Sequence, residues 1–309
     1  MTWVSWRLQR TETLIALGIL ALLAAFLVPT GIQMGNAYHH DGLAACLSGN
    51  PTPTCENALG GFRQHFQSTL DLANWFNLVP GLIGVLLAAP FLYDLERGTY
   101  RLAWTQSISR DRWLLGKIGL AVLTALLAAG ALILLFTWWR GPSVHIDGSL
   151  ETGNYDFTGT VVVGYTLFAL ALAMAVGAIW RRVATSLIVA YVGYVALRVF
   201  VDSSLRDHLV SPAKVTWKGA QQQPSFLDNA HVISLMGTLH GTQIIGSGGG
   251  FFGIGKGGGG ARMSNVVFHA VYQPVSDFWP LQLTETGLFI GLAGILIGFA
   301  TWWTRSRAS

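Results

Sequence analysis

Charged side chains gather in one short stretch of a chain that otherwise carries few. The 309 residues include 19 Lys and Arg and 15 Asp and Glu, only 11% of the sequence. Eight of these charges lie in "YDLERGTYRLAWTQSISRDRWLLGK", Tyr93 to Lys117. Basic residues beside apolar runs mark the side of a membrane that stays in the cytoplasm. Asp94 and Glu96 gain nothing from anionic lipid, so they indicate an ion pair or a partner protein.

A second stretch is similar to a nucleotide-binding loop but lacks part of its chemistry. "GFFGIGKGG", Gly250 to Gly258, nearly matches the phosphate-binding pattern G-x-x-x-x-G-K-[ST]. Gly257 stands where the pattern needs a hydroxyl group for Mg²⁺, and no apolar strand precedes the loop. The glycine-rich segment 241–260 therefore predicts a flexible loop, and we expect this chain to bind no nucleotide.

Histidine and cysteine side chains offer two further chemistries. "YHHDG", Tyr38 to Gly42, contains metal-binding residue types, but adjacent residues rarely converge on one ion, so we expect a solvated loop and no metal site. The only cysteines are Cys46 and Cys55, in "CLSGNPTPTC". An extracytoplasmic location favours a disulfide between them, worth about 2 to 3 kcal/mol on the chain-entropy model. Two free thiols are the alternative.

Six apolar runs must position these residues. The sequence is 52% hydrophobic with a mean hydropathy of +0.48, and runs of about 18 or more apolar residues are typical of membrane spans. The predicted spans are 13–32, 75–92, 115–139, 160–180, 184–201 and 284–303. The sequence therefore predicts an all-α polytopic membrane protein that forms a single transmembrane domain, 1–309.

The distribution of basic residues predicts the orientation. Eleven of the 19 Lys and Arg lie in alternate segments, and these segments include both termini. We therefore expect a protein of the plasma membrane whose two termini lie in the cytoplasm. Two long loops, 34–74 and 202–283, are then expected outside the membrane. Trp138 and Trp139 fall at the outer boundary, where aromatic rings collect at the level of the headgroups. Positive charge used in this way gives no reason to expect a nucleic-acid partner.

Two apolar segments near the C-terminus have distinct predicted roles. In the last span, Gly287, Gly291, Gly294 and Gly298 repeat at a spacing that lets helices approach closely, either inside the bundle or against a second copy. The preceding segment, "SNVVFHAVYQPVSDFWPLQLTETG", is unusually apolar for an exposed loop. It predicts either a pair of short helices dipping into the outer leaflet or a loop packed on the surface.

The charged stretch also has local structural signals. Pro90 removes one backbone hydrogen bond near the inner end of the second span and should kink the helix. Gly98 interrupts the helix, and Thr99 can cap a short helix that places Arg101 toward water. Ser107 or Ser109 can then cap the helix of the third span.

This stretch resembles the segment between the second and third helices of ABC-2 type transporter permeases. That segment typically contains an acid, Gly-Thr, a short apolar helix, then Ser-Arg and a Lys. The matching residues here are Glu96, Gly98, Thr99, Ser109, Arg110 and Lys117. Six spans, internal termini and a long outer segment before the last helix extend the resemblance over the whole topology.

The resemblance implies a permease of two protomers, identical or related, driven by cytoplasmic ABC ATPase subunits that bind ATP and Mg²⁺. Segment 93–117, with Arg101 among its residues, would couple the two proteins. The substrate path would lie between protomers, where Asn77, Tyr191 and Tyr194 suit an amphipathic, lipid-like or peptide (antibiotic) substrate. Most of the family exports its substrates. This chain has no room for a fused ATPase, so the ATPase is expected to be a separate chain.

Two other classes of function remain as alternatives. A transporter driven by an ion gradient usually has ionisable groups at the middle of the membrane, and these spans have almost none. A membrane-embedded hydrolase would depend on histidines of the outer loops, such as His39, His40 and His231. Transport in proteoliposomes without an ATPase, or loss of activity on replacing those histidines, distinguishes these classes from the first.

Overall fold

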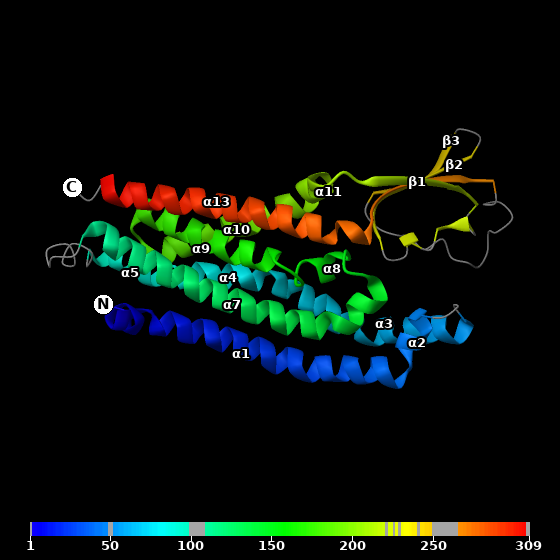
Figure 1. Ribbon diagram of the computed structural model, residues 1–309, viewed down its shortest axis with the longest axis horizontal. Coiled ribbons are helices and arrows are strands. Elements are labelled where there is room, and N and C mark those ends of the chain that lie inside the picture. The colour runs from blue at the N-terminus through cyan, green and yellow to red at the C-terminus, as the bar shows by residue number, and fades with distance from the viewer. Residues whose placement is uncertain are drawn as a thin grey trace.

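The long helices lie side by side in one bundle, with both chain ends at one end and a four-stranded sheet at the other (Figure 1). The computed structural model describes residues 2–48, 52–98, 109–219, 222–224, 226–227, 230–239, 242–248 and 265–306. Within these ranges, six helices are long and apolar enough to cross a membrane. The predicted all-α polytopic class with six spans is therefore confirmed.

Five of the six spans are continuous helices, and each extends beyond or closely matches the predicted apolar run. They are α1 (Thr2–His40), α7 (Arg110–Asp147), α9 (Val161–Trp180), α10 (Val183–Phe200) and α13 (Phe278–Ser306). The remaining span is composite and consists of η1 (Trp75–Leu78), α4 (Val79–Leu87) and α5 (Ala89–Arg97). The helix is interrupted at Ala88 because Pro90 lies in the first turn of α5, where its missing N–H is tolerated.

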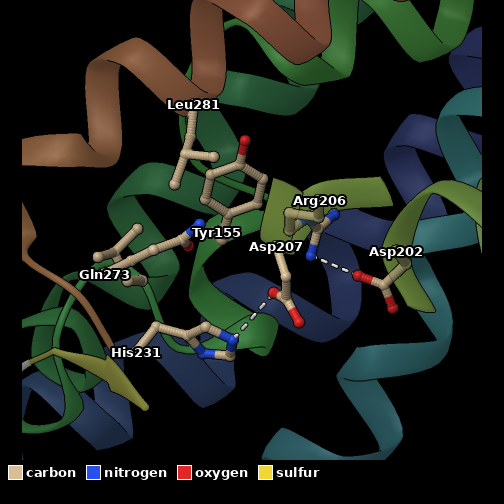
Figure 2. A pocket seen from close by; sticks show the side chains of 8 residues that line it. Tyr155, Asp202, Arg206, Asp207, His231, Gln273 and Leu281 are labelled. Atoms are coloured by element: carbon tan, nitrogen blue, oxygen red, sulfur yellow. Dashed lines mark ion pairs between the residues drawn. The ribbon is translucent and has the colours of Figure 1, made fainter. Parts of the chain in front are cut away.

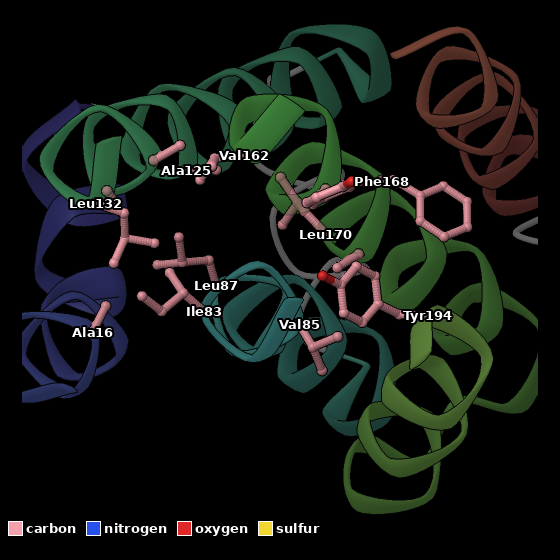
Figure 3. Close-up of a cluster of buried hydrophobic side chains, with 14 of the residues drawn as sticks. Ala16, Ile83, Val85, Leu87, Ala125, Leu132, Val162, Phe168, Leu170 and Tyr194 are labelled. Carbon is pink, nitrogen blue, oxygen red and sulfur yellow. The ribbon is translucent and has the colours of Figure 1, made fainter. Parts of the chain in front are cut away.

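Helix α9 forms the centre of the bundle. Of the residues in its most apolar window, 72% are buried, compared with 22% in α1. It contacts α4, α7, α10 and α13. Figure 3 shows Phe168 and Leu170 of α9 near Val85 of α4 and Tyr194 of α10. A helix surrounded by other helices must be apolar on all its faces, and α9 is.

The first outer segment, 34–74, is mostly helical, and the prediction of a long loop there is wrong. Helix α1 continues to His40, and α2 (Leu43–Ser48) and α3 (Pro53–Asn74) follow. Thr52 caps α3 by accepting a hydrogen bond from the Cys55 N–H at 3.3 Å. Helix α3 is amphipathic and buries Phe62 and Phe66, so it packs as a surface helix although it lacks a long apolar run.

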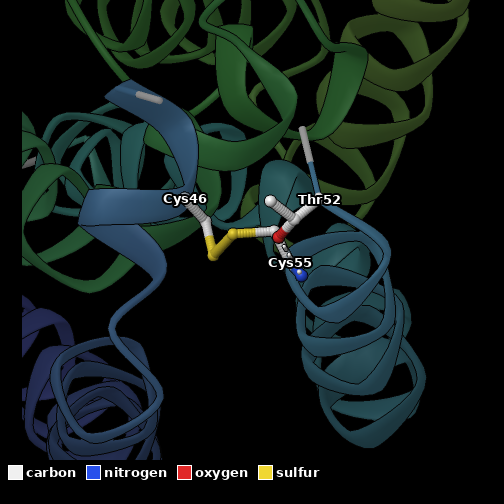
Figure 4. Close-up of a disulfide and its surroundings, with 3 residues drawn as sticks. All are labelled: Cys46, Thr52 and Cys55. Atoms are coloured by element: carbon white, nitrogen blue, oxygen red, sulfur yellow. Dashed lines mark hydrogen bonds between the residues drawn. A yellow bond between two sulfur atoms is a disulfide. The ribbon is translucent and has the colours of Figure 1, made fainter. Parts of the chain in front are cut away.

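A disulfide joins Cys46 of α2 to Cys55 of α3, with their Cα atoms 5.4 Å apart (Figure 4). Replacing both cysteines by serine is expected to lower the free energy of unfolding by about 2 to 3 kcal/mol, because the open chain regains loop entropy. Thermal unfolding in detergent measures the effect. Wild-type protein treated with a reductant should match the variant, and equal stability of oxidised wild type and variant would contradict the expectation.

The second outer segment, 202–283, contains a sheet that the sequence did not predict. Its strands are β1 (Ala213–Lys218), β2 (His231–Leu239), β3 (Thr242–Gly248) and β4 (Val267–Gln273), all antiparallel in the order β1-β4-β2-β3. The remaining short elements are α8 (Thr152–Tyr155), η2 (Val201–Leu205), α11 (Arg206–Leu209) and η5 (Val275–Asp277). Neither short helices dipping into the membrane nor a surface-packed loop is formed where β4 lies.

The sheet has a small core of its own. Trp217 of β1 and Phe268 of β4 are paired across the strands, and their rings stack with centroids 5.4 Å apart. Leu227, Leu235 and Ala270 are buried with them. Aromatic cross-strand pairs of this kind stabilise a sheet and fix its register. The motif "GFFGIGKGG" lies outside the described residues.

Candidate functional site

The charged stretch begins and ends as its sequence predicts. Helix α5 ends at Gly98, whose φ of 68° is a left-handed conformation that glycine adopts without strain. Ser109 caps α7 by accepting a hydrogen bond from the Arg112 N–H at 3.4 Å. Thr99 and Arg101 lie outside the described residues, as does the short helix predicted there. Arg110 is the first residue of α7.

Three polar contacts involve the two ends of this stretch. One joins the ends to each other, and two join them to other helices. Lys117 Nζ of α7 lies 2.8 Å from Asp94 Oδ2 of α5, and both side chains are largely buried. Glu96 Oε2 accepts a hydrogen bond of 3.0 Å from the Val183 N–H at the start of α10. Arg305 Nη2 of α13 lies 2.7 Å from Asp111 Oδ1. The ion pair of Lys117 with Asp94 joins the two ends of the stretch, and the other two contacts attach it to α10 and α13.

These contacts correct the predicted role of Lys117 and add a structural role to that of Glu96. Lys117 is buried in an internal ion pair, so it is not available to a partner protein. Glu96 caps the start of α10 from another helix. The N-cap residue of α10, Arg182, makes no capping hydrogen bond with its own side chain. The positive end of the helix dipole favours a carboxylate there. The exposed Glu96 side chain still faces the end of the bundle that holds both termini.

A buried network of charges, which the sequence did not predict, lies at the opposite end of the bundle. Asp156 binds two cations, with Arg198 Nη2 2.7 Å from Oδ2 and Arg206 Nη2 2.8 Å from Oδ1. Arg206 Nε also lies 3.2 Å from Glu285 Oε2. All four side chains are buried. The network joins the segment before α9 to α10, α11 and α13.

Two tyrosines complete the network by donating to Glu285. Tyr155 OH lies 3.0 Å from Oε2, and Tyr165 OH donates to Oε1. Burial raises the pKa of Tyr155 above its ordinary value, and the Glu285 charge adds to this, so Tyr155 remains a donor. Burial opposes ionisation of Asp156, but the Arg198 and Arg206 guanidinium groups hold its pKa below the ordinary value. Its stabilising contribution is therefore present at neutral pH and is lost only in acid.

A cavity of about 100 Å³ lies beside this network, between the bundle and the sheet. Figure 2 shows Arg206 next to Asp202, and His231 of β2 next to Asp207 of α11, with Nε2 and Oδ1 3.7 Å apart. Gln273 of β4 also lines the cavity, and its buried Nε2 has no hydrogen-bond partner among the described residues. Ligand sites usually occupy about 300 to 1,000 Å³, so this volume suits ordered water rather than an amphipathic molecule.

The residues predicted to line a substrate path do not share one surface. Tyr194 is fully buried in the core, where its ring packs against Gly81 of α4, so its predicted role on an open surface is wrong. Tyr191 is half-buried and stacks on Tyr194 with ring centroids 6.2 Å apart. Asn77 of η1 is half-buried. Asn77 and Tyr191 therefore remain as candidates.

The four glycines of the last span are exposed, and a Cβ added to each would have no atom within 4 Å. The predicted close packing of Gly287, Gly291, Gly294 and Gly298 inside the bundle is therefore wrong, while packing against a second copy stays a prediction. Close approach occurs elsewhere, at Gly84 beside the Thr166 carbonyl and at Gly177 beside Leu92. Those glycines bring α9 against α4 and α5.

The histidines of the outer segments are scattered. His40 pairs with Asp41 at 3.1 Å on an exposed surface, and His231 lies near Asp207 in the cavity. A search of the described ranges finds no group of three or more His, Cys, Asp or Glu that can hold a metal ion.

Six apolar helices, an interrupted second span and a charged stretch fixed to two other helices define a polytopic membrane protein. Residues 17–206 match the family described as ABC-2 membrane transporter related. The match covers more than half of the chain, which therefore belongs to this family and is the membrane component of an ABC transporter. Comparisons with curated proteins and with solved structures gave no match.

Proposed function

We propose that the chain is the permease subunit of an ATP-driven exporter. A separate cytoplasmic ABC ATPase, which binds the ATP and Mg²⁺, drives it through segment 93–117. Two protomers, identical or related, form the transporter in the plasma membrane, with both termini in the cytoplasm. The substrate is amphipathic, either lipid-like or a peptide such as an antibiotic, in keeping with half-buried Asn77 and Tyr191 among apolar residues.

The attachment of the charged stretch to α10 and α13, together with the ion pair that joins its two ends, is the observation that carries this proposal. A force applied by an ATPase to residues 98–109 reaches α10 through Glu96 and α7 through Asp94 and Lys117. Coupling needs a structural element whose position depends on both the ATPase and the substrate path. The charged stretch can be that element, because short polar contacts at its two ends connect it to the membrane helices. Helix α10 is one of the helices expected to line the path.

Purification in a mild detergent tests the proposal directly. A soluble ATP-binding chain is expected to accompany the permease, and the complex is expected to hydrolyse ATP faster when substrate is added. If no such chain accompanies it, and the permease alone transports in proteoliposomes under an ion gradient, the protein is a secondary transporter instead.

Replacing Glu96 by alanine is expected to weaken coupling without unfolding the protein. The variant leaves the Val183 N–H without its acceptor, at a cost of about 1 kcal/mol for a lost helix cap. Transport per ATP hydrolysed should then fall about fivefold, the factor that corresponds to about 1 kcal/mol of coupling free energy. The measurement is transport and ATP hydrolysis by the reconstituted complex.

Glu96→Gln is the matched control, because its amide oxygen still accepts the hydrogen bond. It should retain most of the coupling. Wild-type transport by the alanine variant would remove Glu96 from the coupling path.

A further inference from the structure

A second and larger cavity opens at the end of the bundle that carries the disulfide and the sheet. Its volume is about 370 Å³, and α3, α7 and the segment around α8 line it. This volume falls within the range of about 300 to 1,000 Å³ that ligand sites occupy. The cavity shares no lining residue with the cavity beside the Asp156 network.

The inner wall of this cavity contains a buried cation that forms no ion pair among the described residues; the charges of Asp156, Glu151 and Asp147 act on it only from beyond 4.0 Å. Arg140 of α7 is 3% exposed, and its guanidinium group lies 5.2 Å from the ring centroids of both Trp139 and Phe157. Its hydrogen bonds go to amide oxygens, at 2.7 Å to Asn74 and 3.3 Å to Asn154. Among the described residues, no carboxylate lies within 4.0 Å of it, and its Nε has no partner. A buried charge left in this state is costly, which favours an anionic ligand.

A second unsatisfied polar group lies beside it. Ser143, three residues further along α7 and on the same face, is 2% exposed, and its buried Oγ has no partner among the described residues. The backbone leaves room for the arginine because residue 153 is glycine. A Cβ there would lie 2.9 Å from Arg140 Nη1 and 2.8 Å from Asn74 Oδ1.

The mouth of the cavity carries the opposite charge. Asp71 of α3 and Glu151 are exposed and line it. Asp147 lies there too, but it is neutralised by Arg63, whose Nε is 2.8 Å from Oδ1. The cavity therefore presents a cation and a hydroxyl group in its depth and two carboxylates at its edge. A ligand that matches this order carries an anion followed by an ammonium group.

The depth of Arg140 in the membrane identifies the source of such a ligand. Arg140 directly follows Trp138 and Trp139, at the boundary where aromatic side chains meet lipid headgroups, and Trp138 is half exposed. The phosphates of a bilayer lie at this level, and their ammonium groups extend toward water. We propose that this cavity binds the headgroup of an aminophospholipid, with its phosphate at Arg140 and Ser143 and its ammonium at Asp71 and Glu151. The site does not depend on the transported substrate.

Lipid retention in nanodiscs tests the proposal. The discs contain equal amounts of phosphatidylethanolamine, phosphatidylcholine and phosphatidylglycerol with identical acyl chains, and native mass spectrometry identifies the lipids that stay bound. Wild-type protein is expected to retain phosphatidylethanolamine in preference to both others. Arg140→Gln should lose bound phospholipid of every headgroup.

Because the Arg140 variant can fail for reasons of folding, the exposed carboxylates provide the sharper test. The Asp71→Asn, Glu151→Asn pair should fold normally, and its preference for phosphatidylethanolamine over phosphatidylglycerol should fall at least about fivefold, as expected for the loss of two exposed charge contacts. Asp41→Asn with Asp277→Asn is the matched control, since these acids do not line the cavity. Equal retention of the three lipids by wild type, or an unchanged preference in the Asp71, Glu151 pair, would overturn the proposal.

A third arm separates a lipid from a free anion. Inorganic phosphate and soluble phosphoethanolamine are added to delipidated protein in detergent, and thermal unfolding is followed. The lipid assignment predicts a smaller shift with either small molecule than with short-chain phosphatidylethanolamine. A full shift with inorganic phosphate alone would show a free-anion site instead.

Discussion

Replacing Asp156 by asparagine is expected to lower the free energy of unfolding by about 3 to 5 kcal/mol, the cost of removing one partner from a buried ion pair. The carboxylate binds Arg198 and Arg206 at 2.7 and 2.8 Å, and all three groups are buried. Without it, the one carboxylate among the described residues that lies within 4.0 Å of Arg198 is Glu285, at 3.9 Å. Thermal and denaturant unfolding of the purified protein measure the loss.

A matched carboxylate and a double variant make this prediction specific. Asp202 also pairs with Arg206, but its side chain is 38% exposed, so Asp202→Asn should cost less than about 1 kcal/mol. Adding Arg198→Met to Asp156→Asn removes the cation left behind, and the double variant should lose less than the sum of the single losses. Additive losses would mean that the two side chains do not depend on each other.

Gly81→Ala is expected to destabilise the protein by about 3 kcal/mol, at the upper end for overpacking a core. The added Cβ would lie 2.1 Å from Tyr194 Cε1 and 2.4 Å from Cδ1, and the Tyr194 ring is held in the buried centre of the bundle. The ring or the helix must therefore move. The fraction of protein that remains monodisperse after heating is the measurement.

Gly130→Ala is the matched control, because that glycine also lies within a helix and a Cβ there meets no atom within 4 Å. It should leave stability unchanged or slightly improved, since alanine favours helix more than glycine does. Truncating Tyr194 to alanine in the Gly81→Ala background should recover part of the loss. If Gly81→Ala and Gly130→Ala are equally stable, α4 and α10 are not in the close contact described.

The sequence predicts the spans well because a membrane fixes both their length and their composition. Hydropathy therefore locates all six helices, and the strong local signals at Pro90, Gly98 and Ser109 give the correct helix boundaries. Outside the membrane the same criteria fail. Helix α3 is amphipathic, and β4, "VFHAVYQ", has only three of its seven residues buried, so neither produces a long apolar run. Alternation of buried and less buried residues, present in the first half of this strand, is a local signal that could have indicated β4.

The charged sites were harder to predict because their partners are distant in sequence. Asp156, Arg198, Arg206 and Glu285 come from four segments, and a single sequence does not indicate which of them meet. The position of Glu96 next to the second span predicts a role in coupling. Its contact with α10 depends on how the bundle folds, which local sequence does not indicate. Local patterns thus gave the ends of the charged stretch, and only the tertiary structure gave its attachments.

The disulfide between Cys46 and Cys55 allows the orientation of the protein to be measured in a living cell. It lies at the end of the bundle away from both termini (Figure 1), and such bonds persist only in an oxidising compartment. Blocking free thiols in intact cells before lysis therefore records which compartment that end has reached. The two cysteines act as a built-in reporter of membrane insertion, one that needs no tag at either terminus.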